Sequence, residues 1–166
     1  PEMIVRGEMN VKESGVDNVE FRLGEAESMP VEDAAVDLII SNCVINLSPD
    51  KKKVFQEAYR VLKPGGRMLI SDIVTHAVPQ AIRDDMNAWA GCVAGALEED
   101  AYLRVIRAAG FEQVEIAGRI SIGEEMVLGL ISSGPHSEEA LARFGQWKKL
   151  GYQDGMVSSI KVSAVK

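Results

Sequence analysis

The stretch VDLIISNCVINLSPDKKKVFQEAYRVLKPGGRMLISDIV, residues 36–74, decides the fold. Residues 36–41 form a short apolar run without a polar face, which is typical of a strand buried on both sides. Ser48 then predicts a helix cap with Pro49 in the first turn, and a second buried strand, residues 68–74, follows a Lys-Pro-Gly-Gly turn. The helix carries an apolar stripe made of Val54, Ala58, Val61 and Leu62. This strand–helix–strand order predicts a parallel α/β sheet.

The first strand of this unit ends at Asn42 and Cys43. Sheets of this class bind their ligands at the carboxyl ends of parallel strands, so we expect a site at this end. No glycine-rich turn able to cradle a nucleotide-like cofactor precedes the strand. The stretch is therefore expected to supply one half of a cofactor and substrate site.

The rest of the chain continues the alternation of strands and helices. The expected elements are helices over 1–14, 98–109 and 137–150, a helix and loop over 79–97, and strands over 19–23, 111–122 and 156–165. Ser137 is the expected cap of its helix, with Leu141, Phe144 and Trp147 on one face. At 166 residues, one α/β domain is the expected organisation.

Composition limits the partners and the compartment. The net charge of −7 and the pI near 4.9 argue against nucleic acid or an anionic membrane as a partner. No apolar run approaches the roughly 18 residues of a membrane span, and no signal peptide is recognisable. Two cysteines without a disulfide-rich pattern predict a cytoplasmic protein.

Four pieces of the chain together resemble the class I methyltransferases that use S-adenosylmethionine. They are residues 24–27 (GEAE), 36–42 (VDLIISN), 62–66 (LKPGG) and 109–111 (AGF). Two further pieces are more specific and look like arsenite methyltransferases: residues 42–47 (NCVINL) and 89–97 (WAGCVAGAL). The resemblance covers residues 1 to about 122 and the final strand. It implies a partial Rossmann-like sheet, mostly parallel with an antiparallel closing strand, whose first two strands are missing.

The resemblance also implies roles for individual residues. Cys43 and Cys92 match the cysteines that hold trivalent arsenic in that family. Ala26 and Glu27 match residues beside the adenine of S-adenosylmethionine, and Asn42 and Leu47 match residues that line the cofactor cleft. The family's glycine-rich loop, its ribose-binding acid and a further cysteine have no counterpart here. The chain is thus expected to be a single, incomplete methyltransferase domain over 1–166, with 123–152 as a family-variable helical segment.

The chemistry explains why such an enzyme needs thiols. Trivalent arsenic is soft and prefers thiolate sulfur to oxygen or nitrogen. Two thiolates hold it with its lone pair available to take up a methyl group, so no general base or other catalytic side chain is needed. Catalysis would rest on positioning, which can supply on the order of 7–11 kcal/mol.

Simpler interpretations of these residues stay open. Free cysteines are among the most buried residues, so both could belong to the core. Asn42 could simply end its strand, and Glu27 could be a solvated loop acid. His76 and His136 lack a paired carboxylate in the sequence and are read as surface residues.

Two other functions also stay open: a methyltransferase for a quinone or another small acceptor, and a non-catalytic thiol module that sequesters arsenic or a similar soft ion. In the family, the strand at 36–41 lies next to the missing first strand, which would leave an exposed apolar edge. We expect either a homo-oligomer that covers this edge or a rearranged amino-terminal part. The remaining alternative is that the chain is cut from a longer protein.

Overall fold

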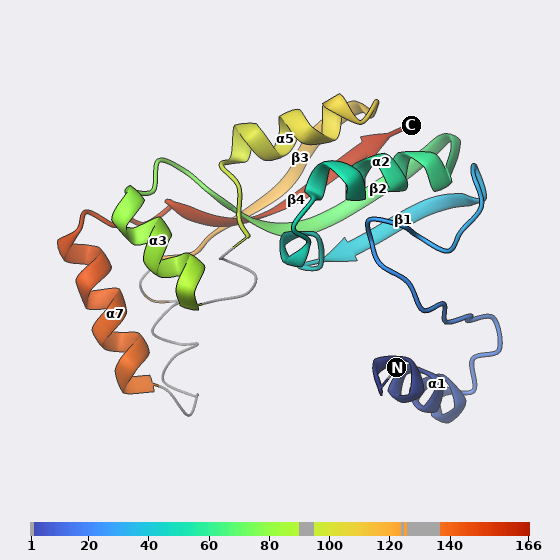
Figure 1. Cartoon of the computed structure of the whole chain (residues 1–166), viewed down its shortest axis with the longest axis horizontal. Coiled ribbons are helices and arrows are strands. Elements are labelled where there is room, and N and C mark those ends of the chain that lie inside the picture. The colour runs from blue at the N-terminus through green and yellow to red at the C-terminus, as the bar shows by residue number, and fades with distance from the viewer. Residues whose placement is uncertain (1, 90–94, 124, 126–136) are drawn as a thin grey trace.

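The computed structural model describes residues 2–89, 95–123, 125 and 137–166 (Figure 1). Its sheet has the strand order β1-β2-β4-β3. These strands are β1 (Val36–Asn42), β2 (Leu62–Thr75), β3 (Glu112–Ser121) and β4 (Val157–Val165). β1 pairs with β2 in parallel, whereas β4 is antiparallel to both β2 and β3. Three strands therefore run the same way and the last strand of the chain opposes them, which confirms the predicted α/β sheet with an antiparallel closing strand.

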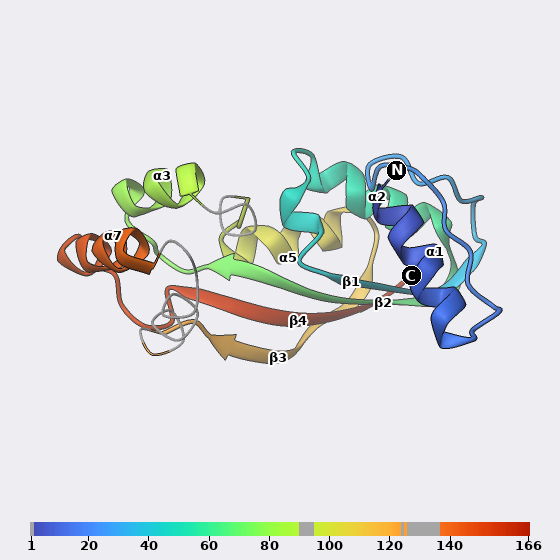
Figure 2. The same cartoon turned by 90° about the horizontal axis from the view of Figure 1, so that it is seen from below.

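Two helices cover one face of the sheet, α2 (Lys51–Val61) and α5 (Glu99–Ala108) (Figures 1 and 2). The stripe predicted for α2 is buried, and Phe55 of α2 meets Tyr102 of α5 edge to face at 5.6 Å between ring centroids. The core beneath them includes Met68, Ile70, Val74, Ile106, Ile160 and Val162. Burying each large apolar side chain contributes about 1.5–3 kcal/mol, so this layer anchors both helices to the sheet.

The start of α2 differs from the prediction. Asp50, rather than Ser48, is the cap, and its carboxylate accepts the backbone N–H of Lys53 at 3.0 Å. Ser48 instead ends a 3₁₀ helix, η1 (Ile45–Leu47), with an extended backbone. Its hydroxyl accepts the N–H of Asp50 at 3.1 Å and donates to Glu27. The prediction placed the cap two residues early because this contact with Glu27 is not visible in the local sequence.

The two-sided burial predicted for residues 36–41 is wrong. Leu38 and Ile40 of β1 are 47% and 72% exposed, and Leu69 of β2 is 43% exposed on the same open face. Val36 and Ile39 pack against the core on the other face. An apolar run predicts burial only where a second layer covers the sheet, and no such layer covers Leu38 and Ile40 in the described part of the chain.

The amino-terminal helix forms where expected, as α1 (Glu2–Ser14), and ends at Gly15 in the left-handed conformation. The strand predicted at residues 19–23 is wrong: this segment has no regular secondary structure and pairs with no strand in the described part of the chain. A strand needs a hydrogen-bonding neighbour, which local alternation cannot supply. The ring of Phe21 instead lies against Gly7 of α1.

A second apolar cluster lies at the carboxyl end of β2. It brings together α3 (Gln80–Trp89), α7 (Ser137–Lys149) and the start of β4 (Figure 1). Its buried members are Ile73, Val78, Ile82, Phe144, Trp147, Tyr152 and Val157. Phe144 and Trp147 share a buried face as predicted, while the side chain of Leu141 lies outside the described residues. Among the described helices, none has the length and apolar content to cross a membrane.

Candidate functional site

The site is centred on the turn that follows β1. Cys43 has a φ of 55°, a left-handed backbone that is uncommon outside glycine and often marks functional sites. Its N–H donates to the Ser71 carbonyl at 2.8 Å, so it is attached to the end of the β1–β2 ladder. Its side chain is half-buried against the second apolar cluster. Cys43 thus lies at the carboxyl end of the parallel pair, where the sequence predicted a ligand site.

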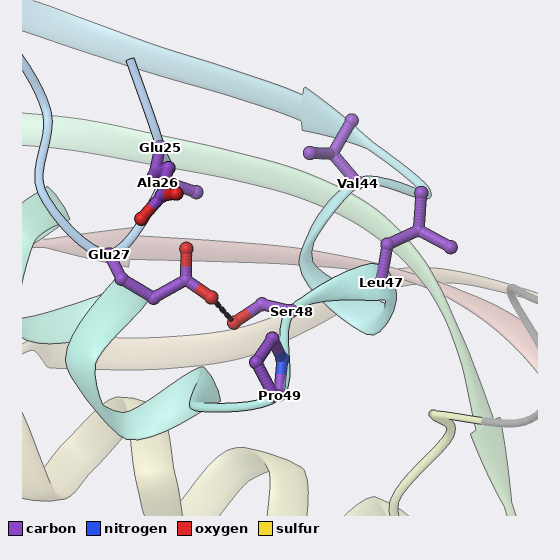
Figure 3. Close-up of a pocket in the computed structure, with 7 residues that line it drawn as sticks. All are labelled: Glu25, Ala26, Glu27, Val44, Leu47, Ser48 and Pro49. Atoms are coloured by element: carbon purple, nitrogen blue, oxygen red, sulfur yellow. Dashed lines mark hydrogen bonds between the residues drawn. The ribbon is translucent and has the colours of Figure 1, made fainter.

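A pocket of about 360 Å³ opens beside this turn (Figure 3). Its lining residues are Glu25, Ala26, Glu27, Val44, Leu47, Ser48 and Pro49. One wall is the loop of residues 25–28, which a hydrogen bond from the Ser28 N–H to the Glu25 carbonyl closes at 3.1 Å. The opposite wall is residues 44–49, which present apolar side chains. The structure therefore brings together Ala26, Glu27 and Leu47, three of the four predicted cofactor contacts.

The side chain of Glu27 joins the two walls. Its carboxylate accepts a hydrogen bond from the Ser48 hydroxyl, drawn as the dashed line in Figure 3. Glu27 is therefore held in place instead of being a freely solvated loop acid. Sequence reasoning did not assign Val44, Ser48 or Pro49 to the pocket, although Val44 lies within the cysteine motif and the other two follow it directly.

Asn42 lies apart from this pocket. It pairs in register with Ser71 at the end of β1 and is exposed. It lines a separate, mostly apolar groove of about 240 Å³ on the open face, together with Ile40, Leu69 and Val162. A contact of Asn42 with a cofactor stays a prediction.

Buried polar groups form the floor under the Cys43 turn. The Asn46 side-chain amide donates to the Ile73 carbonyl at 2.7 Å, and the Tyr102 hydroxyl donates to Asp72 at 2.8 Å. Lys51 donates to the carbonyls of Ser48 and Asn46 at 3.1 and 3.3 Å. Burial raises the pKa of the Asp72 carboxyl and lowers the pKa of the Lys51 ammonium. Sequence reasoning missed this floor. The sequence feature that could have indicated it is Asp72, a single aspartate within an apolar strand, because a buried carboxylate needs polar partners.

The second predicted cysteine, Cys92, lies outside the described residues. Gly95, three positions later, is described and touches the turn of Cys43. A Cβ built on Gly95 would lie 1.9 Å from the carbonyl oxygen of Asn46, which is three positions after Cys43. The two motifs, 49 positions apart, therefore meet backbone to backbone at this point. Glycine is required there because any side chain would occupy the space of the carbonyl.

A charged cluster near the carboxyl end of β2 corrects the interpretation of His76. His76 is at the surface, but its Nε2 lies 3.0 Å from Glu99 and 2.9 Å from Arg119. Arg119 also binds Glu99 at 2.6 Å, and this hydrogen bond holds the pKa of the Glu99 carboxyl below its usual value. His136 lies outside the described residues. Within the described ranges, no three His, Cys, Asp or Glu side chains are grouped to hold a metal ion.

Comparison with known proteins defines the class. Residues 1–110, about two thirds of the chain, match the family described as "Methyltransferase domain", and the chain belongs to this family. Its fold agrees: the structure of a putative sarcosine dimethylglycine methyltransferase from Galdieria sulphuraria superposes with a TM-score of 0.76 at 20% identity, covering 100% of this chain and 66% of that one.

More specific similarity is to arsenite methyltransferases. The arsenite methyltransferase of Halobacterium salinarum is 50% identical over 118 residues, which cover 70% of this chain and 30% of that protein. The human arsenite methyltransferase is 48% identical over 77 residues, covering 46% of this chain and 20% of that protein. The crystal structure of CrArsM, an arsenic(III) S-adenosylmethionine methyltransferase from Chlamydomonas reinhardtii, superposes with a TM-score of 0.67 at 33% identity, covering 92% and 46% of the two chains. The chain thus spans about a third or less of the curated relatives named here.

Proposed function

We propose that this chain carries the arsenic-binding portion of an arsenite methyltransferase, which transfers a methyl group from S-adenosylmethionine to thiol-bound trivalent arsenic. One observation supports this most directly. The turn that carries Cys43, at the carboxyl end of β1, lies beside a pocket and is in backbone contact with the segment that follows Cys92. The 50% identity to an arsenite methyltransferase favours arsenic over a quinone or another small acceptor.

The pocket fits the nucleoside part of S-adenosylmethionine. Its volume of about 360 Å³ lies in the range of small-molecule sites. Val44, Leu47 and Pro49 offer apolar surface for a planar ring, and the carboxylates of Glu25 and Glu27 can accept hydrogen bonds from amino or hydroxyl groups. We assign Ala26, Glu27 and Leu47 to this part of the cofactor. Asn42, beside Cys43, would contact a part of it outside this pocket.

Cys43 and Cys92 are the proposed arsenic ligands. When two thiols bind arsenite, two As–O bonds break and two As–S bonds form, and each thiol proton leaves with a hydroxide as water. Cys43 is held by the ladder of β1 and β2, so its sulfur starts from a rigid element. Bound S-adenosylmethionine would supply the electrophilic methyl group that the arsenic lone pair takes up.

Titration with a phenylarsenical, which takes two thiols, tests the arsenic site. Wild-type protein is expected to bind one equivalent, and Cys43→Ser and Cys92→Ser are each expected to weaken binding at least a hundredfold, because one thiol cannot chelate. Leu150→Ser, at an exposed position directly after α7, is the matched control and should bind as wild type does. Unchanged affinity in either cysteine variant would refute the assignment.

A second titration, with S-adenosylmethionine, separates transfer from sequestration. Heat of binding together with arsenite-dependent methyl transfer supports the enzyme. Arsenical binding without any response to S-adenosylmethionine would instead identify a thiol module.

The organisation and setting of the protein are proposed on other grounds. We infer that residues 1–166 act as one methyltransferase domain in which 123–152 varies within the family, and that its thiols need a reducing cytoplasm. β1 lies at one edge of the sheet in the described residues, and its exposed face carries Leu38 and Ile40. Exposed apolar edges favour pairing with another chain, so a second copy is proposed to cover this edge.

A further inference from the structure

The pocket wall at residues 25–28 belongs to no regular helix or strand, so its position depends on side-chain contacts. Those contacts come from α2, through the residues that follow the wall. The Met29 N–H donates to the Glu57 carboxylate at 2.9 Å. Arg60 donates to the Met29 carbonyl at 3.1 Å and to the Val31 carbonyl at 2.8 Å. Two side chains of one helix thus hold the backbone directly beside the pocket.

The guanidinium of Arg60 is the centre of this arrangement. It forms a two-point pair with Glu57, at 2.8 and 2.7 Å, and a further ion pair with Asp33 at 2.7 Å. A planar fork with five N–H donors can make all these bonds at once, whereas a lysine ammonium cannot. The side chain of Glu57 is only 18% exposed, so solvent screens the pair less than a surface ion pair.

The wall is therefore fixed at two places. At the mouth of the pocket Glu27 binds Ser48, and behind the wall Glu57 and Arg60 bind residues 29–33. α2 is itself fixed, because Val54, Phe55 and Ala58 are buried in the core. The distance between the two walls is thus set by a helix that contributes no side chain to the pocket lining.

We propose that Glu57 and Arg60 are positioning residues for the nucleoside pocket, which hold the wall at residues 25–28 at its working distance from residues 44–49. This inference rests on the proposed function, in which this pocket takes the adenosine part of the cofactor. It adds a specific role for α2: the helix supports the binding site as well as the core.

Amide hydrogen exchange and ligand binding test the proposal in the same set of variants. Arg60→Lys keeps the charge but loses the fork, and is expected to speed exchange in residues 24–31 about tenfold while leaving β2 and β4 unchanged. The dissociation constant for S-adenosylhomocysteine should rise about tenfold, and the affinity for a phenylarsenical should stay the same. Glu57→Gln keeps an oxygen that can accept the Met29 N–H. Its exchange rates in residues 24–31 and its dissociation constant should therefore lie closer to the wild-type values than those of Glu57→Leu.

Lys166→Ala is the matched control for a purely structural effect. The Lys166 ammonium donates to the carbonyls of Tyr59 and Leu62 at 2.6 and 2.7 Å and to that of Arg60 at 3.4 Å, so it binds backbone at the carboxyl end of α2, whereas Arg60 holds residues 29–33 through its guanidinium. Its loss should lower stability without changing exchange in residues 24–31 or the ligand affinity. An equal rise of the dissociation constant in Lys166→Ala and Arg60→Lys, or no change in Arg60→Lys, would overturn the proposal. Wild-type protein that binds the arsenical but no nucleoside would refute the assignment of this pocket to the cofactor. In that case the hydrogen-exchange rates of residues 24–31 would still show whether Glu57 and Arg60 hold the wall in place.

Discussion

Replacing Gly95 by alanine is the sharpest test of how the two cysteine motifs meet. The added Cβ would lie 1.9 Å from the carbonyl oxygen and 3.0 Å from the carbonyl carbon of Asn46, and 3.2 Å from the ammonium nitrogen of Lys51. The first two are backbone atoms, which a rotamer change cannot move away. The strand-end turn and the segment after Cys92 must therefore separate.

The size of the effect follows from these distances. Side-chain Cβ atoms essentially never come closer than 3.0 Å to such a neighbour, so the contact must open from 1.9 Å by about 1 Å. Overpacking of this kind costs typically about 1–3 kcal/mol. A misplacement of about 1 Å at reacting groups can cost on the order of 100-fold in function. We therefore expect Gly95→Ala to lose about 1–3 kcal/mol of stability and to bind a phenylarsenical at least tenfold more weakly.

Urea unfolding and calorimetric titration with the phenylarsenical measure the two effects. Gly145→Ala is the control, because Gly145 lies in α7 and has no atom within 4 Å of an added Cβ. Alanine is a better helix former than glycine by about 0.5–1 kcal/mol, so this variant should be slightly more stable and bind normally. A Gly95→Ala protein with wild-type stability and affinity would show that the contact with Asn46 does not connect the motifs.

Three further changes test other parts of the structure. Burial raises the pKa of Asp72 above its ordinary value of 3.8, so the folded state holds this proton more tightly than the unfolded state. Wild type should therefore lose stability relative to Asp72→Asn as the pH rises from about 3.8 through the folded-state pKa. In Asp72→Asn the amide oxygen can still accept the Tyr102 hydroxyl. A difference in unfolding free energy between the two proteins that does not change with pH, measured by urea titration, would contradict the raised pKa of Asp72. Lys166→Ala should cost about 1.5–3 kcal/mol in denaturant unfolding, against less than about 1 kcal/mol for Lys63→Ala, whose ion pair is exposed. Ile40→Lys changes a side chain that is 72% exposed and should alter stability by less than about 0.5 kcal/mol, yet convert an edge-paired oligomer to monomer in light scattering. A wild-type protein that is already monomeric would refute the second copy.

Local patterns were sufficient for the elements that pack in the usual way. The stripe of α2 follows from helical periodicity, and it is buried. β4 was predicted from its apolar residues alone, and its neighbours are now known to be β2 and β3. In these elements the partner layer is present, so local preference and tertiary packing agree.

Patterns failed where a distant residue decides the outcome. Residues 19–23 alternate like a strand, but no described strand lies beside them. Ser48 looks like a helix cap, but its hydroxyl donates to Glu27, 21 positions earlier. The bonds of Arg60 to Met29 and Val31 join positions 31 and 29 residues apart. No short window of sequence contains both partners of such contacts.

The candidate site combines the two situations. The motif around Cys43 predicted that a thiol would stand at the end of a parallel strand, and that is where the structure places it. The left-handed backbone of Cys43 was not predictable, because its cost of about 1–3 kcal/mol must be offset by its surroundings. Those surroundings are the Ser71 carbonyl and the amide of Asn46, the residue that Gly95 also touches. The direction of the sulfur is therefore set by the backbone and by groups far along the chain, and a change at any of these supports should weaken arsenic binding without removing a thiol.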